Sequence, residues 1–280
     1  MNVDNYTIGY LGPEGTFTQK AAFKIKEANT DLKSYDTISK VLRAVENHDI
    51  KLAVVPIENS TEGSVDLTLD LLAHKYDLKI CGEIILSITQ NLLVNKNANF
   101  DDIKVIYSHS QAIAQCNKYL EKINKEIRST DSTAKAAKEV LKSKHVAAIG
   151  NHDLSKIYNL KILDESIQDY QNNVTRFVIV SSTDHYLTGN DKTSIIFSLM
   201  EDKPGALYEI LAEFDKEKIN LTKIESRPSK KGLGDYIFFI DMQGHRSDEN
   251  ISRTLDNIQK KVGNMKILGS YPINTFQEVL

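Results

Sequence analysis

The sequence predicts an α/β protein in two parts, a larger domain over residues 1–185 and a smaller α+β domain over residues 194–280. Three observations carry this prediction. At 280 residues, the chain is long enough for two domains and sizeable cores. Up to residue 185, strand-like and helix-like runs alternate, which favours helices layered on a largely parallel sheet. Beyond a polar, turn-rich stretch, the order changes to strand–helix–strand–strand–helix–strand, and residues 186–193 are expected to form a linker.

The elements of the larger domain follow from apolar runs bounded by turn residues. Strands are predicted over residues 7–12, 52–58, 85–94, 105–108, 146–150 and 175–182. Helices are predicted over residues 16–28, 64–76, 111–123 and 129–143. The last of these runs opens with the N-cap residues of STDST and continues as an alanine-rich segment, which is typical of a helix start.

The smaller domain has the order of a ferredoxin-like βαββαβ unit. Its strands are predicted over residues 194–200, 219–227, 235–242 and 265–271, and its helices over residues 204–218 and 248–262. The segment KKGLGD (230–235) is predicted to be a hairpin-like turn between the two middle strands.

Composition excludes several classes of function. The net charge of −3 and the pI near 6.2 give no basic footprint, so no nucleic-acid partner is expected. No apolar run approaches the roughly 20 residues of a membrane helix, so no membrane association is expected. The first residues lack a secretory pattern, and the two cysteines are too few for a disulfide framework, so the expected compartment is the cytoplasm. The histidines are scattered without ligand spacing, and no metal is expected.

The stretch TRFVIVSS (175–182) is the most informative segment for function. It reads as a buried strand that opens with a hydroxyl and a guanidinium, Thr175 and Arg176, beside the amides Asn172 and Asn173. A polar pair at the mouth of an apolar strand favours a strand end that faces a ligand in a crevice between α/β units. The alternative is an ordinary strand that follows an asparagine-rich turn.

Three strand–helix junctions share one chemical character. GPEGTFT (12–18) is a glycine-containing turn into a helix N-terminus, where free N–H groups favour an anion. PIENSTEGS (56–64) and SHSQAIAQC (108–116) add neutral donors and one carboxylate: Glu58, Asn59, Ser60, Ser108, Gln111 and Gln115. Helix capping explains each junction taken alone. For Glu58, a role in capping and a role in catalysis are equally consistent with the sequence. Together with Thr175 and Arg176, the junctions predict a cleft for a small carboxylate-bearing anion.

Two segments of the smaller domain also stand out. DKPGALYE (202–209) places small residues at a helix start, which permits close approach of a ligand, and INLTKIESRP (219–228) ends a strand in charged residues and a proline. The second segment could serve only to protect an edge strand. Alternatively, both could belong to an amino-acid pocket shared between subunits.

The motifs GPEGTFT, PIENSTEGSV, SHSQAIAQC, DSTAKAA, VAAIG and NNVTRF, in this order, resemble the prephenate dehydratase family. DKPGAL, ESRP and GDYIFFID resemble the ACT regulatory domain fused to that enzyme. The resemblance covers nearly the whole chain and is to the monofunctional form, without a chorismate mutase helix bundle. It implies two α/β lobes like those of a periplasmic binding protein, with the active site in the cleft between them. It also implies the conversion of prephenate to phenylpyruvate, carbon dioxide and water, a step toward L-phenylalanine.

The resemblance further implies roles for individual residues. The catalytic set is Thr175, Glu58, Asn59, Ser108 and Gln115, and the substrate-binding set is Ser60, Gln111, Arg176 and Phe177. L-phenylalanine is expected to bind as an allosteric effector at Gly205, Ala206, Leu207, Asn220, Leu221, Glu225, Ser226, Arg227 and Pro228. The implied assembly is a homodimer or homotetramer. No cofactor is expected, because loss of carboxylate and hydroxide creates an aromatic ring and is strongly downhill.

Two other functions stay open on the sequence. An arogenate dehydratase would act on the amino-acid analogue of prephenate with the same motifs. A non-catalytic amino-acid sensor would use the same polar cleft for capture alone. The TRF motif together with the ENS and SHSQ runs favours the prephenate enzyme.

Overall fold

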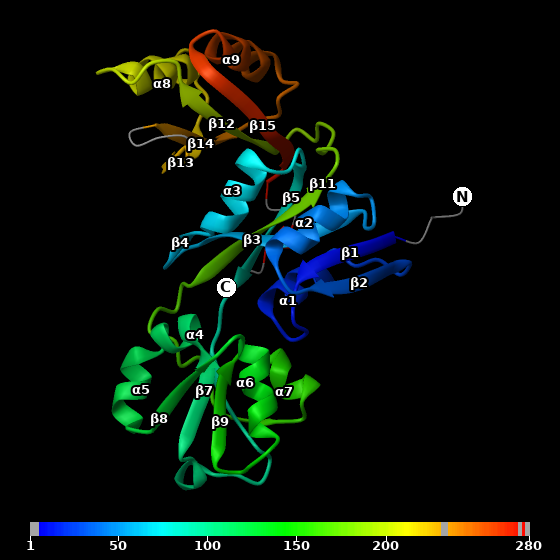
Figure 1. The fold of residues 1–280 in the computed structure, drawn as a ribbon, viewed down its shortest axis with the longest axis vertical. Helices are drawn as coiled ribbons and strands as arrows, with labels where there is room; N and C mark the ends of the chain where they lie inside the picture. Colours follow the sequence, from blue (N-terminus) through cyan, green and yellow to red (C-terminus); the bar gives the residue numbers. More distant parts are fainter. Residues whose placement is uncertain (1–5, 231–234, 274–275, 278–280) are drawn as a thin grey trace.

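The computed structural model describes residues 6–230, 235–273 and 276–277. It places three sheets one after another along the long axis of the molecule (Figure 1). We call the part built on the middle sheet, which contains β1–β5, β11 and β16, lobe 1. The part built from residues 91–164 is lobe 2, and the part that begins at residue 191 is the C-terminal domain. The predicted turn at 230–235 lies largely outside the described residues.

Lobe 1 is a mixed sheet with helices packed on its faces. Its strand order is β16-β5-β11-β3-β1-β2, with β4 paired to β3. The strands are β1 (Tyr6–Leu11), β2 (Thr30–Tyr35), β3 (Leu52–Asn59), β4 (Gly63–Ser64), β5 (Lys79–Ser87), β11 (Val174–Ser181) and β16 (Phe276–Gln277), and the helices are α1 (Phe17–Lys24), α2 (Ile38–Glu46) and α3 (Asp66–His74). Strands β1, β2 and β3 are parallel, whereas β11 runs antiparallel to both β3 and β5, so the sheet is less parallel than expected.

Lobe 2 is a second mixed sheet, of strand order β10-β6-β9-β7-β8. Its strands are β6 (Asn91–Val94), β7 (Val105–His109), β8 (Glu126–Thr130), β9 (Val146–Gly150) and β10 (Lys161–Asp164). Its helices are η1 (Phe100–Asp102), α4 (Ser110–Ala114), α5 (Asn117–Ile123), α6 (Thr133–Val140) and α7 (Asp153–Ile157). The predicted N-cap segment of α6 is confirmed, because the Ser132 hydroxyl accepts from the Lys135 N–H at 3.1 Å.

The chain crosses between the lobes twice, and this corrects one predicted element. The single strand expected over residues 85–94 is divided between the two sheets, with β5 ending at Ser87 and β6 beginning at Asn91. The second crossing, before β11, lies beside the first: the Ile88 N–H donates to the Asn173 carbonyl at 2.8 Å. Strand β2 was not predicted, because it is a largely polar edge strand with little hydrophobic signal. Helix α2 was also missed, although its buried face of Ile38, Val41, Leu42 and Val45 carries a clear helical signal. Strands β8 and β10 and helix α7 are three further short elements that were not predicted.

The C-terminal domain has the predicted βαββαβ order. It consists of β12 (Asp191–Leu199), α8 (Ala206–Lys216), β13 (Leu221–Pro228), β14 (Tyr236–Gln243), α9 (Glu249–Gln259) and β15 (Val262–Pro272), with strand order β13-β14-β12-β15. Strand β12 begins inside the expected linker. The Asp191 carboxylate accepts from Thr188 and Gly189, and this local turn gives the segment its polar, linker-like composition.

The C-terminal domain shares a hydrophobic core with lobe 1. Ile196, Ile237 and Phe239 are buried in the same cluster as the apolar residues of α2, α3, β3 and β11. After the C-terminal domain, the chain returns to lobe 1, where its last strand, β16, pairs in parallel with β5. The two domains are therefore packed as neighbours with a common interior. Within the described ranges, no helix is long and apolar enough to cross a membrane.

A glycine in β15 permits a close approach of the two domains. Gly269 has φ of 151°, and a Cβ at this position would lie 2.1 Å from the carbonyl oxygen of Ile80 in β5. We expect Gly269→Ala to lower the free energy of unfolding by about 2–4 kcal/mol, because backbone cannot move aside as a side chain can. Urea unfolding measures the loss. Gly189→Ala is the matched control: its φ is also positive, at 91°, but nothing lies within 4 Å of the added Cβ. Equal losses in the two variants would contradict the close-packing explanation.

Candidate active site

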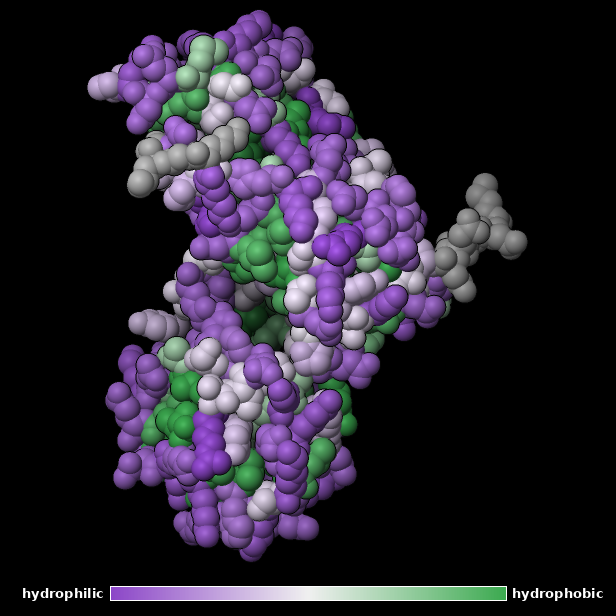
Figure 2. All heavy atoms as spheres, viewed as in Figure 1, coloured by the Kyte–Doolittle hydropathy of each residue, from purple (hydrophilic) through white to green (hydrophobic). Residues whose placement is uncertain are grey.

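A cavity of about 350 Å³ lies between lobe 1 and lobe 2. Figure 2 shows the molecule hollowed between these lobes, with hydrophobic atoms in the recess. All three predicted junctions contribute to its lining: Gly12 and residues 16–18 from the first, Asn59 from the second, and His109, Gln111 and Gln115 from the third. Thr175 and Phe177 of β11 complete the lobe 1 wall. The structure thus brings together segments that are distant in the sequence, as predicted.

Thr175 and Asn59 form the central polar pair of the cavity. They are register partners on β11 and β3, and the Asn59 Nδ2 donates to the Thr175 Oγ1 at 2.9 Å. Since this amide already donates to the hydroxyl oxygen, the hydroxyl proton of Thr175 is available for donation into the cavity. Only 9% of Thr175 is exposed, so water competes weakly for this donor.

The orientation of the Asn59 amide is determined by its surroundings. Its Oδ1 accepts from the Thr61 N–H at 3.0 Å, the Thr61 hydroxyl at 2.7 Å and the Glu62 N–H at 3.1 Å. Its Nδ2 also donates to the Asn173 Oδ1 at 2.8 Å. Because backbone N–H groups can only donate, the amide oxygen must face them and the amide nitrogen must face Thr175.

Glu62 connects lobe 1 to lobe 2 through two glutamines that line the cavity. Its carboxylate accepts from the Gln115 Nε2 at 2.7 Å and from the Gln111 Nε2, and the Gln90 Nε2 donates in turn to the Gln115 Oε1 at 3.2 Å. The two glutamines, one in the first turn of α4 and one at its C-cap, lie on the same face of this helix, as their spacing predicts. Sequence reasoning missed Glu62, although it lies in the same motif as Glu58 and a second acid there was a visible signal.

Two predicted cleft residues, Arg176 and Glu58, point away from the cavity. Each adjoins a cavity residue on its strand, and neighbouring side chains on a strand point to opposite faces of the sheet. The Arg176 guanidinium contacts Glu58 at 3.0 Å and Asp241 of the C-terminal domain at 2.8 Å. The expectation that Arg176 and Glu58 line the cleft is therefore corrected: both belong to the interface with the C-terminal domain.

Two predicted serines are also not among the residues that line the cavity. Ser108 is fully buried and donates to the Ile149 carbonyl at 2.8 Å, which ties β7 to β9. Ser60 accepts from the Val174 N–H at 3.0 Å and donates to the Asn172 carbonyl at 3.3 Å, so it holds the segment that leads into β11. Both serines support the site and do not line it.

The predicted effector residues fall into two groups at opposite ends of the C-terminal domain. Gly205, Ala206 and Leu207 lie at the start of α8, which follows β12. The last residues of β12 and of β13 both pair with the start of β14, so this is the end of the sheet that holds Ser226 and Pro228. Asn220 and Leu221 lie at the other end of β13, where Leu221 pairs with Met242.

Two side chains of the effector set contact lobe 1 of the same chain. Arg227 binds Asp66 and Asp70 of α3, and Glu225 accepts from Ser64 of β4.

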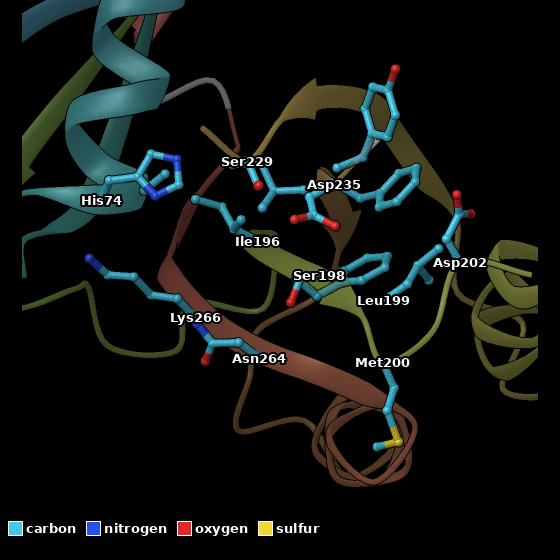
Figure 3. A pocket seen from close by; sticks show the side chains of 15 residues that line it. His74, Ile196, Ser198, Leu199, Met200, Asp202, Ser229, Asp235, Asn264 and Lys266 are labelled. Atoms are coloured by element: carbon cyan, nitrogen blue, oxygen red, sulfur yellow. The ribbon is translucent and has the colours of Figure 1, made fainter. Parts of the chain in front are cut away.

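A second cavity, of about 320 Å³, lies between the C-terminal sheet and α3 (Figure 3). His74 of α3 faces Lys266 and Asn264 of β15 and Ile196 of β12 across it. No predicted effector residue is among those that line it. Lys266 donates to the carbonyls of Leu72 and Tyr76 at 2.9 and 2.7 Å, so its ammonium is used to anchor β15 on α3.

In the described part of the chain, neither a reactive thiol nor a metal-binding cluster is found. Burial raises the pKa of the Cys116 thiol to about 12 and that of Cys81 likewise to about 12, so neither is a thiolate at neutral pH. Among the described residues, no group of three or more His, Cys, Asp or Glu side chains is placed to hold a metal ion.

These features define a class of protein: two α/β lobes around a cavity lined by apolar side chains and by hydrogen-bonding amides and hydroxyls, joined to a βαββαβ domain. The comparisons with known proteins specify the family. The prephenate dehydratase family model matches residues 8–185, and the ACT domain model matches residues 193–259. The chain therefore belongs to the prephenate dehydratase family, and the expected enzyme class, fold and ACT domain are confirmed.

Individual relatives match over almost their full length. The prephenate dehydratase of Methanocaldococcus jannaschii is 44% identical, with 96% of this chain and 99% of the relative covered. That of Bacillus subtilis is 38% identical, with 94% and 98% covered. The crystal structure of a prephenate dehydratase from Arthrobacter aurescens in complex with L-Phe has a TM-score of 0.88 at 35% identity, covering 98% of this chain and 92% of that chain.

Proposed function

We propose that this chain converts prephenate to phenylpyruvate, carbon dioxide and water in the cavity between its two lobes. The observation that carries the proposal is the Asn59–Thr175 pair, which presents an oriented hydroxyl to the cavity. In the reaction, the ring carboxylate leaves as carbon dioxide, and its bonding electrons enter the ring. The ring hydroxyl leaves with a proton as water, and the ring becomes aromatic.

Thr175 assists the departing hydroxyl by hydrogen bonding. A threonine hydroxyl is a weak acid, so it acts as a positioned donor through which a proton from water is relayed, and no free Thr175 alkoxide forms. The buried setting strengthens this hydrogen bond relative to water. Phe177 and Ile88 supply apolar surface for the ring in the same cavity.

The pyruvyl carboxylate of prephenate suits the polar wall of the cavity. The first helix, α1, begins at Phe17 behind the Thr16 cap, and its N-terminal N–H groups favour a negative charge. Gln111 and Gln115 add amide donors from lobe 2, now bound to the Glu62 carboxylate. We propose that a substrate carboxylate shares these donors with Glu62 when the lobes close around it.

We further propose that L-phenylalanine regulates the enzyme through the ACT domain in a homodimer or homotetramer. The Arthrobacter relative was solved with L-Phe bound. The start of α8 and the start of β13 lie at opposite ends of the domain, so one pocket can use both only if a second copy contributes one of them. Strand β13 is at the edge of the C-terminal sheet, and an edge strand can pair with the edge strand of a second copy. The cytoplasmic location stays a prediction.

One assay tests the function. The purified chain is mixed with prephenate, and phenylpyruvate is followed with and without EDTA and with arogenate as a competing substrate. We expect prephenate turnover that survives chelation and falls when L-phenylalanine is added. Binding of prephenate without product would identify a sensor, and turnover of arogenate alone would identify the amino-acid enzyme. Sedimentation with and without L-phenylalanine measures the oligomeric state.

A further inference from the structure

Charged side chains from six strands meet between lobe 1 and the C-terminal domain. Lobe 1 contributes Glu58, Glu83 and Arg176 from β3, β5 and β11, and the C-terminal domain contributes Lys192, Lys223 and Asp241 from β12, β13 and β14. We call these six residues the interdomain ion cluster. Each domain thus presents charges of both signs, and their sum is zero.

Arg176 is at the centre of this cluster. Its guanidinium lies 2.8 Å from the Asp241 carboxylate, 3.0 Å from Glu58 and 3.4 Å from Glu83. Its side chain is 11% exposed, that of Asp241 is 10% exposed, and that of Glu83 is fully buried. Pairs this far from water are weakly screened, and removal of one member of such a pair is costly.

The cluster residues of the C-terminal domain are held by hydrogen bonds and ion pairs. Asp241 accepts from the Ser194 hydroxyl at 2.5 Å, and Ser194 is in turn 2.6 Å from the Tyr271 hydroxyl. Burial alone would raise the pKa of the Asp241 carboxyl, but Arg176 and Ser194 hold it below its ordinary value, so Asp241 is ionised at neutral pH. Lys192 binds the buried Glu83 at 2.8 Å, and Lys223 lies 3.3 Å from Glu58.

The cluster lies directly behind the candidate catalytic pair. In the β3–β11 register, Thr175 is opposite Asn59 and Arg176 is opposite Glu58, so the two pairs are adjacent along the same two strands. One pair faces the cavity and the other faces the C-terminal domain. The register shifts immediately after Arg176, and such irregularities re-aim side chains beside active sites. A displacement of the cluster therefore displaces the donor of Thr175.

We propose that Arg176, Glu58 and Asp241 are positioning residues for the dehydratase reaction: an ACT-domain carboxylate, acting through Arg176, sets the strand pair that carries Asn59 and Thr175. This inference rests on the proposed function. It replaces the substrate-binding role expected for Arg176 and gives the ACT domain a part in positioning the catalytic pair even without an effector.

Steady-state kinetics of the full-length chain tests the proposal with Asp241→Asn. The variant keeps shape and leaves Arg176 with two carboxylates, so the fold is expected to persist, as circular dichroism can verify. We expect kcat to fall about 5- to 50-fold with KM within threefold of wild type, because misplacement by less than 1 Å is costly to the chemical step and the cluster does not touch substrate. Asp256→Asn is the matched control, since it removes the same charge from an exposed position on α9 and is expected to leave kcat unchanged.

Arg176 variants separate positioning from substrate binding. We expect Arg176→Lys to recover part of the kcat lost in Arg176→Met, with KM again near wild type, because a cation restores the link to Asp241. A KM raised more than tenfold with kcat retained would show that Arg176 binds a substrate carboxylate and would overturn the proposal. So would wild-type kcat in Asp241→Asn. If the wild-type enzyme fails to convert prephenate, the proposed function is wrong and this inference falls with it. If the wild-type enzyme is active and the variants match it, only this inference is wrong.

Discussion

Replacing Thr175 by valine is expected to lower kcat for prephenate by roughly 10²- to 10⁴-fold, the range typical for loss of a positioned proton donor. Valine keeps the β-branched shape that the buried strand β11 requires and removes only the hydroxyl. Asn59 loses one acceptor but still donates to Asn173 and Val174, so its amide stays satisfied. The fold is therefore expected to persist, and the loss appears in kcat.

Prephenate turnover measured at saturating substrate checks this expectation, with thermal unfolding as the test of integrity. Thr175→Ser keeps the hydroxyl and is expected to retain much of the activity. Thr7→Val makes the same change on β1 of the same sheet, outside the residues that line the cavity, and is expected to match wild type. A Thr175→Val enzyme within threefold of wild type would remove Thr175 from the mechanism.

Asn59→Asp is expected to lower kcat by roughly 10²- to 10³-fold, comparable to loss of one preorganised donor in an active site. At neutral pH, the new carboxylate can only accept hydrogen bonds, yet the replaced nitrogen faces three acceptors, on Asn173, Val174 and Thr175. The Thr175 hydroxyl would then donate to the carboxylate and no longer to the cavity. The change also leaves buried acceptors unpaired, at a cost to stability of about 1–3 kcal/mol.

Asn173→Asp is the matched control for this prediction. Asn173 is also buried, but its Oδ1 is the acceptor in the contact with Asn59, and aspartate preserves that acceptor. We expect it to lose less than tenfold in kcat, measured alongside the urea midpoint of both variants. Equal losses of kcat at the two positions would mean that charge in this region, and not the direction of the hydrogen bond, decides activity.

The comparison of Thr175 with Arg176 shows how far sequence reasoning reached in the site. TRF identified a strand end with polar residues, and that strand end lies at the cavity. The alternation of side chains on a strand already implied that Thr175 and Arg176 face opposite ways. Which of them faces the cavity depends on what packs on each face of the sheet, and that is a property of the assembled domains.

In the ACT domain, the sequence likewise predicted the order of the elements but not the contacts that they make. The order of elements from residue 191 follows from hydrophobic runs and turns, which are local. The ESR triplet was recognised as unusual, but Glu225 and Arg227 are bound to Ser64 and Asp66 of lobe 1, about 160 positions away in the chain. A charged triplet on a strand has no local signal for the partner that will neutralise it.

The family, the two-part organisation, the βαββαβ unit and the three junctions that line the cavity follow from the amino-acid sequence alone. These depend on short-range periodicity, caps and motif order, all of which can be read within a few tens of residues. Three features depend on how the domains assemble: Glu62 connects the lobes, Arg176 and Glu58 face the C-terminal domain, and β16 rejoins the sheet of lobe 1. The physical reason is that burial and charge pairing are set by which surfaces come together, and residues distant in sequence choose those surfaces jointly.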